Sequence, residues 1–270
     1  MNRRTFIQWN CRGFKVNFNE LSLLIQNHNP VALCLQETHL KNTDNIRIKN
    51  YTMYNHYAPA DRASGGSSIA IHNNYIHSQI NLTTNLQAIA VRLTLHKTIT
   101  ICSIYIPPNH QLQFQELTNL IAQLPAPFLL MGDFNAHNPL WGSDKMSDKG
   151  KKLEDAISHH NLCISNDGSK TYLHPGNGSY SSIDISIVDP SLLLDMNWTV
   201  HDDLCGSDHF PIIVKTNDPP ENNPIINWKL EKADWSIYES LCLQELQIQK
   251  FDNHPDAIQK FTEIVFRNRK

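Results

Sequence analysis

The chain has 270 residues, of which 40% are hydrophobic and 18% are charged, and its formal net charge is −3. This is an ordinary globular composition, which excludes a disordered or fibrous chain. A protein that only coats nucleic acid is expected to be basic, so the charge disfavours that class, but it says little against a nuclease whose acidic pocket holds cations.

The predicted elements begin with short apolar runs, rich in branched residues and bounded by turn residues, which are typical of strands. In chain order these runs are 5–9, 31–36, 67–71, 88–95, 98–106, 128–131, 183–188, 199–200 and 211–215. Helical apolar spacing is found at 18–26, 111–124 and 150–160. Because strands outnumber helices and neighbouring runs such as 88–95 and 98–106 look like hairpins, we expect a layered α/β fold with mixed sheets.

A polar, proline-rich segment at 217–224 marks the end of this pattern. We therefore predict a first domain at 1–216, a linker at 217–226 and a helical connector at 227–270. The connector has helical apolar spacing at 235–248 and 257–266. Two helices bury little surface alone, so we expect them to pack on the first domain or to belong to a longer polypeptide.

The six cysteines are widely spread and form no CxxC pair, which argues against a zinc site or a disulfide framework. No stretch approaches the ~20 apolar residues of a membrane span, and the first ten residues lack the apolar run of a signal peptide. We expect an intracellular protein with no membrane partner.

Polar clusters follow directly after several predicted strands, where α/β sheets usually place their sites. They contain four carboxylates, and these are Glu37, Asp133, Asp184 and Asp208. Hard cations such as Mg²⁺ prefer such oxygen ligands. The same clusters hold amides, a phenol and a histidine, and these are Asn10, Asn135, Tyr105 and His209. The set suits hydrolysis at phosphorus, because amides and phenols donate to phosphate oxygens and a histidine beside an aspartate handles protons near neutral pH.

Each residue alone also has a purely structural interpretation. Asn10 could be a turn residue and Glu37 a solvated strand end. The segment from Gly132 to Asn135 could be a simple turn, and Asp208-His209 could cap the turn before Pro211. Asp184 is harder to explain in this way, because an aspartate between Ile183 and Ile185 is costly unless it is hydrogen-bonded. The joint occurrence of these residues at strand ends favours a functional site.

The motifs resemble those of the endonuclease/exonuclease/phosphatase superfamily, in particular the endonuclease domain of non-LTR retrotransposons of the jockey-like group. The matching motifs are Ile7-Gln8-Trp9-Asn10-Cys11-Arg12-Gly13, Leu33-Cys34-Leu35-Gln36-Glu37-Thr38, Gly65-Gly66, Ser103-Ile104-Tyr105-Ile106-Pro107-Pro108, Met131-Gly132-Asp133-Phe134-Asn135-Ala136-His137, Asn138-Pro139-Leu140-Trp141-Gly142, the segment from Thr171 to Asp184, and Ser207-Asp208-His209. They cover about residues 4 to 216. The resemblance implies a four-layer α/β (α+β) sandwich, in which two mixed β-sheets are flanked by helices.

The resemblance also implies roles for individual residues. Glu37 would hold a catalytic Mg²⁺ (Mn²⁺ being an alternative), with Asn10 beside it and Asp208 at or near the metal. Asp133 would orient or deprotonate the attacking water, while Asn135 and Tyr105 would bind the scissile phosphate. His209, paired with Asp184, would stabilise the transition state. Positions that match DNA contacts are Arg12, Tyr105, Asn135, His137, Thr171 and Ser181.

The implied activity is a DNA endonuclease that nicks double-stranded DNA and leaves a 3′-hydroxyl, which a reverse transcriptase in the same longer polypeptide could extend. Such an enzyme would act in the nucleus, and we expect a monomer. Two alternatives stay open. One keeps the fold but changes the substrate, as in phosphatases or phosphodiesterases on other phosphoesters. The other is an inactive retrotransposon relic.

Overall fold

The computed structural model describes residues 4–57, 65–216 and 235–248. The chain divides into two compact units, Met1–Glu221 and Asn222–Lys270. The described part of the second unit is helix α5 (Trp235–Ile248), which matches the helix predicted there. The predicted linker at 217–226 and the helix at 257–266 lie outside the described residues, so the predicted domain organisation stays a prediction.

The first sheet has six strands in the order β13-β14-β1-β2-β4-β3. Its strands are β1 (Thr5–Asn10), β2 (Ala32–Gln36), β3 (Tyr51–His56), β4 (Ser67–His72), β13 (Met196–Val200) and β14 (Ile212–Thr216). β1 is central, since it pairs in parallel with β2 and antiparallel with β14. Its six residues are all buried, as expected of a strand covered on both faces.

The second sheet has six strands in the order β5-β6-β7-β8-β12-β9. Its strands are β5 (Ile76–Ile80), β6 (Gln87–Thr94), β7 (Thr98–Tyr105), β8 (Phe128–Asp133), β9 (Cys163–Ile164) and β12 (Asp184–Val188). β7 and β8 are parallel, whereas the other pairings are antiparallel. A separate small hairpin is formed by β10 (Tyr172–Leu173) and β11 (Tyr180–Ser181).

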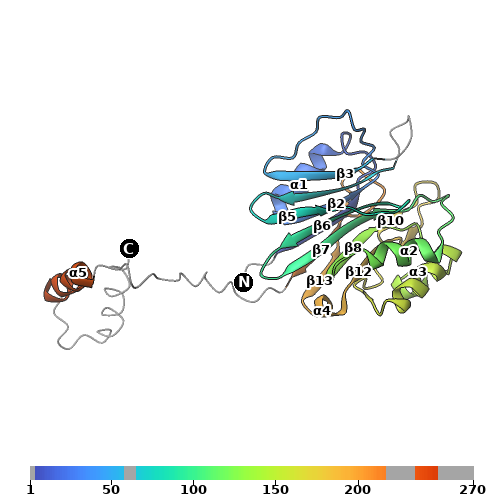
Figure 1. Cartoon of the computed structure of the whole chain (residues 1–270). Helices are drawn as coiled ribbons and strands as arrows, with labels where there is room; N and C mark the ends of the chain where they lie inside the picture. The colour runs from blue at the N-terminus through green and yellow to red at the C-terminus, as the bar shows by residue number, and fades with distance from the viewer. Residues whose placement is uncertain (1–3, 58–64, 217–234, 249–270) are drawn as a thin grey trace. The chain divides into compact units, whose positions relative to one another are not determined.

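The two sheets pack face to face with helices on their outer sides (Figure 1). Because side chains alternate along a strand, Phe6 of β1 joins the core between the sheets, whereas Ile7 and Trp9 pack with α1 (Phe18–His28) on the outer face. On the far side of the second sheet, α2 (Phe114–Ala122) and α3 (Asp148–His159) cover a separate core. Two shorter helices are η1 (Pro139–Trp141) and α4 (Pro190–Leu193). The predicted four-layer fold is confirmed.

The predicted strands and helices of the first unit are all present, with ends shifted by a few residues. The prediction from sequence missed β3 and β5, which are edge strands of the two sheets and contact each other through Tyr54 and His77, and it also missed the two-residue strands β9, β10 and β11. β5 reads Ile76-His-Ser-Gln-Ile80 and is mostly exposed, so it lacks the apolar run that identifies a buried strand. β3 is likewise only partly buried.

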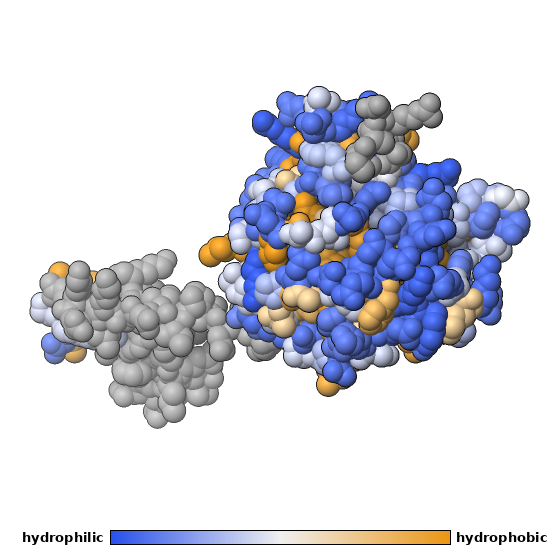
Figure 2. Space-filling view, turned by 45° about the vertical axis from the view of Figure 1, so that its right-hand side comes forward, coloured by the Kyte–Doolittle hydropathy of each residue, from blue (hydrophilic) through white to orange (hydrophobic). Residues whose placement is uncertain are grey.

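On the face shown in Figure 2 the described surface is mostly hydrophilic, as is usual for a globular protein. No helix in the described ranges is long and apolar enough to cross a membrane. Four of the six cysteines are buried as free thiols, and these are Cys11, Cys34, Cys102 and Cys205.

Gly132 of β8 allows the close approach of β7 that brings Asp133 beside Tyr105. A Cβ atom at Gly132 would overlap the carbonyl oxygen of Ile104 on β7. We expect Gly132→Ala to lower the free energy of unfolding by about 3 kcal/mol or more, because the overlap is with backbone in a packed sheet. Urea unfolding measures this.

The matched control is Gly176→Ala, since a Cβ atom there has its nearest neighbour at 3.6 Å. Its expected change is within about 0.5 kcal/mol. A Gly132→Ala protein as stable as this control would contradict the packing described for β7 and β8.

Candidate active site

The predicted catalytic residues lie where strands of both sheets end. Asn10 ends β1, and Glu37 follows β2 in a left-handed conformation with φ 47°. In the second sheet, Tyr105 and Asp133 end the parallel strands β7 and β8, and Asp184 begins the antiparallel strand β12. The register places Asp133 opposite both Tyr105 and Asp184. One edge of the sandwich therefore collects all five residues.

His209 and Asp184 form a buried pair that joins the two sheets. His209 precedes β14, and its Nδ1 lies 2.8 Å from Oδ2 of Asp184, with the side chains 5% and 0% exposed. The other ring nitrogen, Nε2, lies 3.3 Å from Nδ2 of Asn10 and 3.9 Å from Oδ2 of Asp133. The aspartate thereby fixes the ring so that Nε2 faces the remaining site residues.

The charges around this pair shift two pKa values upward. Burial lowers the pKa of His209, but the carboxylates of Asp184, Asp133 and Asp208 more than offset this and raise it to about 9. Burial raises the pKa of Asp133 to about 7, although the nearby His209 acts in the opposite direction. A cationic histidine and a carboxylate that binds protons near neutral pH therefore lie side by side.

Asn10 connects Glu37 to this pair. Its Nδ2 lies 3.1 Å from Oε1 of Glu37 and 2.9 Å from Oδ2 of Asp133, while its Oδ1 accepts the backbone N–H of Arg12. The amide group therefore holds two carboxylates that would otherwise repel each other.

Asn135 is held against Asp133. Its backbone N–H donates to Oδ1 of Asp133 at 2.9 Å, and its Nδ2 donates to Oδ2 at 3.0 Å. Asn135 adopts a left-handed conformation with φ 46°, which asparagine tolerates better than most residues. The turn thus places an amide donor directly beside the carboxylate.

Tyr105 is buried, and its hydroxyl lies in the field of the Glu37 and Asp133 carboxylates. Burial, together with the negative charges of Glu37 and Asp133, raises the pKa of Tyr105 far above its ordinary value. The hydroxyl therefore stays protonated and remains a hydrogen-bond donor.

Ser207 and Asp208 shape the loop that carries His209. The Ser207 hydroxyl donates to the carbonyl of Asn10 at 2.7 Å and accepts the backbone N–H of His209 at 3.2 Å. Asp208 forms an ion pair of 3.0 Å with the exposed guanidinium of Arg12. In addition, the ring of Tyr172 lies 4.6 Å from that of His209, measured between centroids.

Glu37 is the residue best placed to hold a metal. In the described ranges no three His, Cys, Asp or Glu side chains are grouped closely enough to bind an ion together. Mg²⁺ needs no such group, since it keeps several waters and takes one or two carboxylates plus substrate phosphates, so the donor set fits this ion. The partly exposed Glu37 meets this need. Asn10 presents Nδ2 rather than Oδ1 to Glu37, and Asp208 is paired with Arg12, so both would have to rearrange to ligate the same ion.

The residues predicted to contact DNA differ in how exposed they are. Arg12 is exposed, and His137 and Ser181 are half-buried at the surface. Thr171 is fully buried instead, and its hydroxyl accepts the backbone N–H groups of Ile183 and Asp184. The hydroxyl of Thr171 therefore positions Asp184, and its predicted contact with DNA stays a prediction.

Three residues that support the site were not predicted from the sequence, and these are Gln8, Asn166 and Lys149. Gln8 donates to Asp184, and Asn166 donates to the Asp184 carbonyl at 2.9 Å. Lys149 donates to the carbonyls of Pro107 and Pro108, which follow Tyr105 closely. Gln8 could have been found, because a glutamine between Ile7 and Trp9 in an apolar strand needs a partner just as Asp184 does.

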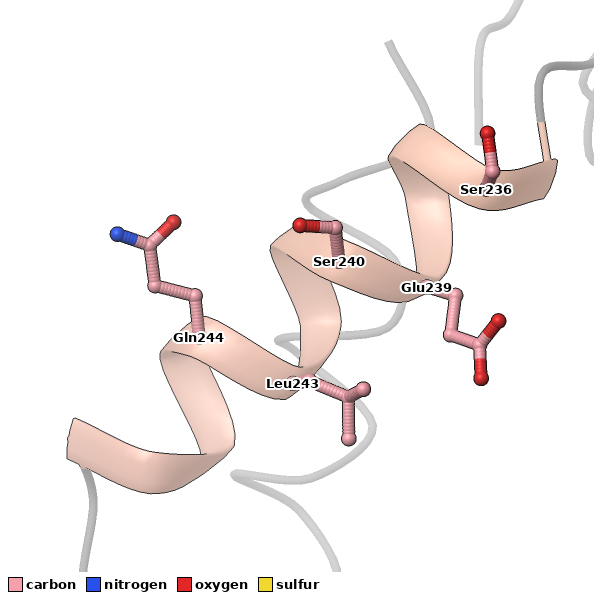
Figure 3. Close-up of a pocket in the computed structure, with 5 residues that line it drawn as sticks. All are labelled: Ser236, Glu239, Ser240, Leu243 and Gln244. Carbon is pink, nitrogen blue, oxygen red and sulfur yellow. The ribbon is translucent and has the colours of Figure 1, made fainter.

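A hollow of about 490 Å³ beside α5 is a separate feature of the second unit. Figure 3 shows the five residues of α5 that line it, which follow one another at helical spacing along the helix, and these are Ser236, Glu239, Ser240, Leu243 and Gln244. These residues supply one carboxylate and no histidine, so they do not form a comparable site.

Comparisons with known proteins agree with this geometry. Residues 99–213 match the family model described as Endonuclease-reverse transcriptase. The RNA-directed DNA polymerase from mobile element jockey of Drosophila funebris is 27% identical over 269 residues, which cover 96% of this chain and 29% of that protein. The protein of the same name from Drosophila melanogaster is 28% identical over 237 residues, which cover 86% of this chain and 26% of that protein. The chain thus spans less than a third of these relatives' length.

Solved structures show the same fold. The endonuclease domain of TRAS1, a telomere-specific non-LTR retrotransposon, matches with a TM-score of 0.69 and 21% identity, covering 79% of this chain and 98% of that one. The AP endonuclease LMAP from Leishmania major matches with a TM-score of 0.63 and 16% identity, covering 80% and 88%. The first unit therefore has the fold of these endonuclease domains. The resemblance to the endonuclease domain of jockey-like, non-LTR retrotransposons that the motifs carry is borne out as a similarity in both sequence and fold.

The raised pKa of His209 predicts a pH-dependent stability in the absence of metal. The folded pKa of about 9 exceeds the ordinary 6.5, so the stabilisation is fully present below about pH 6.5 and is lost as the pH rises through about 9. Urea unfolding in EDTA should give a free energy of unfolding that is roughly 1–3 kcal/mol lower at about pH 9 than at about pH 6.5.

The His209→Asn variant should lose most of this pH dependence. His174→Asn, a change at an exposed histidine, should keep that of the unmodified protein. If the His209→Asn variant showed the same pH dependence of stability as the unmodified protein, His209 would not be its source and the prediction would be wrong.

Proposed function

We propose that the first unit is a Mg²⁺-dependent DNA endonuclease that nicks double-stranded DNA by hydrolysing one phosphodiester. The observation that carries this proposal is the convergence of Asn10, Glu37, Asp133 and the His209–Asp184 pair within hydrogen-bond distances at one sheet edge. Two solved structures with the same fold are described as endonucleases, which supports the proposal of the same type of reaction here.

Asp133 accepts a proton from the attacking water in this scheme. Its pKa of about 7 suits a general base that works near neutral pH. The water oxygen forms a bond to phosphorus as the bond from phosphorus to the 3′ oxygen breaks, and that oxygen takes up a proton. The products are a 5′-phosphate and a 3′-hydroxyl.

Three donors face the charge that develops on the phosphate. Asn135 supplies an amide, Tyr105 supplies a hydroxyl that burial keeps protonated, and His209 supplies a positive charge fixed by Asp184. Preorganised donors of this kind stabilise a transition state without reorganisation. Glu37 would hold the Mg²⁺ ion, which when bound neutralises phosphate charge and stabilises the leaving oxygen.

Arg12, His137 and Ser181 are the proposed contacts to the DNA backbone, since their side chains reach the surface. The chain matches polymerase relatives over less than a third of their length. We therefore propose that a reverse transcriptase lies in the same longer polypeptide and extends the 3′-hydroxyl, that the reaction takes place in the nucleus, and that the domain acts as a monomer.

A supercoiled-plasmid assay tests the activity. We expect Mg²⁺-dependent conversion to open circles, abolished by EDTA, with nicks that a DNA polymerase extends without prior phosphatase treatment. Asp133→Asn and His209→Asn should each lower the rate by about 100-fold or more, because each removes a group that acts in the transition state.

Asp202→Asn is the matched control, since Asp202 is an exposed aspartate and should leave the rate unchanged. A folded protein that does not nick DNA would disprove the endonuclease proposal. Phosphate release from a phosphomonoester would then indicate a phosphatase, and inactivity in both assays would indicate a relic.

A further inference from the structure

Gln8 lies in the middle of β1, between the two sheets and below the proposed site. It is fully buried, and its Nε2 lies 2.9 Å from Oδ1 of Asp184 and 3.2 Å from Oε1 of Gln36. Asp184 belongs to the second sheet, whereas Gln8 belongs to the first. The Gln8 side chain therefore crosses from one sheet to a catalytic carboxylate on the other.

The Asp184 carboxylate has one contact on each oxygen. Oδ2 faces Nδ1 of His209, and Oδ1 accepts from Gln8. The backbone of Asp184 is held separately, by Thr171 at its N–H and by Asn166 at its carbonyl. Among the described side chains, Gln8 is thus the one that fixes how the Asp184 carboxylate is rotated. This rotation sets the direction in which Oδ2 of Asp184 faces His209.

Gln8 is also one end of a row of buried polar side chains. Gln36 of β2 accepts from Gln8 and donates Nε2 to Oγ of Ser103 on β7 at 2.8 Å, and Ser67 of β4 donates to the same oxygen at 2.8 Å. All four side chains are fully buried. Such a row defines one relative position of the sheets, because each bond is lost if the sheets slide.

The amide of Gln8 is oriented at a cost. Its Oε1 is buried and has no hydrogen-bond partner among the described residues. A buried unsatisfied acceptor costs about 1–3 kcal/mol. Turning the amide over would place that oxygen against Oδ1 of Asp184 and Oε1 of Gln36, which are acceptors too. The observed orientation therefore keeps the hydrogen bond from Nε2 of Gln8 to Asp184 and leaves the Oε1 atom of Gln8 without a partner among the described residues.

We propose that Gln8 is a positioning residue of the active site, which acts through Asp184 to hold the His209 ring in its productive direction. The inference rests on the proposed function only for its kinetic consequence. The contact itself is a property of the fold and can be examined without turnover.

The kinetic test uses Gln8→Met, which keeps the volume but removes the donor. We expect kcat for plasmid nicking to fall about 10- to 100-fold with KM changed by less than about 2-fold, as for loss of a group that orients a catalytic partner. In an Asp184→Asn background the same change should cost less than about 3-fold, since Gln8 would have nothing left to position. Full additivity in this cycle, or no loss of kcat, would overturn the proposal.

Two further variants separate positioning from general loss of structure. Gln8→Glu keeps the shape and, when protonated, donates one hydrogen bond, so its kcat should lie between those of the unmodified protein and Gln8→Met. Ser67→Ala removes the far end of the same row and should leave kcat within about 2-fold. A loss of kcat in Ser67→Ala as large as that in Gln8→Met would show a merely structural role.

A spectroscopic measurement tests whether Gln8 orients His209 through Asp184 even if the protein does not nick DNA. The hydrogen-bonded Nδ1–H proton of His209 should give a downfield NMR resonance, which is absent in His209→Asn. We expect Gln8→Met to shift or broaden this resonance and Ser67→Ala to leave it in place. An unchanged resonance in folded Gln8→Met protein would overturn the proposal, whereas a shift without nicking would leave the contact established and the nuclease assignment refuted.

Discussion

The contact between the two sheets at one edge of the sandwich is the constraint on which the site depends. Neither sheet contains a complete set of groups. The first contributes Asn10, Glu37 and the loop with His209, and the second contributes Tyr105, Asp133 and Asp184. The hydrogen bond of 2.8 Å between His209 and Asp184 joins the two sets. The apolar core between the sheets supplies most of the cohesion, but such contacts are not directional, so the polar bonds determine the alignment.

The layered fold could be predicted because its central strands are covered on both faces and therefore read as apolar runs. Edge strands β3 and β5 lack that signal, since half or more of each is in contact with solvent. The gathering of the polar side chains of the site could be predicted as well, because residues at successive strand ends are brought to one edge by the topology. Whether a given polar residue faces the ligand or supports a neighbour could not be predicted. Thr171 illustrates this, because its hydroxyl is turned inward by hydrogen bonds from the backbone at the start of β12, and no pattern in the sequence marks such a bond.

The distribution of charge in the site explains how an acidic chain could accept the polyanionic substrate that we propose. The net charge of −3 includes carboxylates that are gathered in the site, where each has a compensating partner. Asp208 is paired with Arg12, Asp184 is paired with His209, and Glu37 receives a hydrogen bond from Asn10. The site therefore combines hydrogen-bond donors and a cationic ring with a cluster of carboxylates. A bound cation would complete this arrangement, since it adds positive charge where the phosphate enters.

The central place of β1 in the first sheet has a consequence for incomplete copies of this chain. A copy that lacked the segment up to Glu37 would still encode Asp133, Asp184 and His209, together with all strands of the second sheet. It would lack β1 and β2, so that β14 and β4 would each lose a partner strand, and it would lack both Asn10 and Glu37. Shortening the chain from its beginning would therefore break the first sheet and remove two site residues in a single step, even though most of the motifs would remain readable in the sequence.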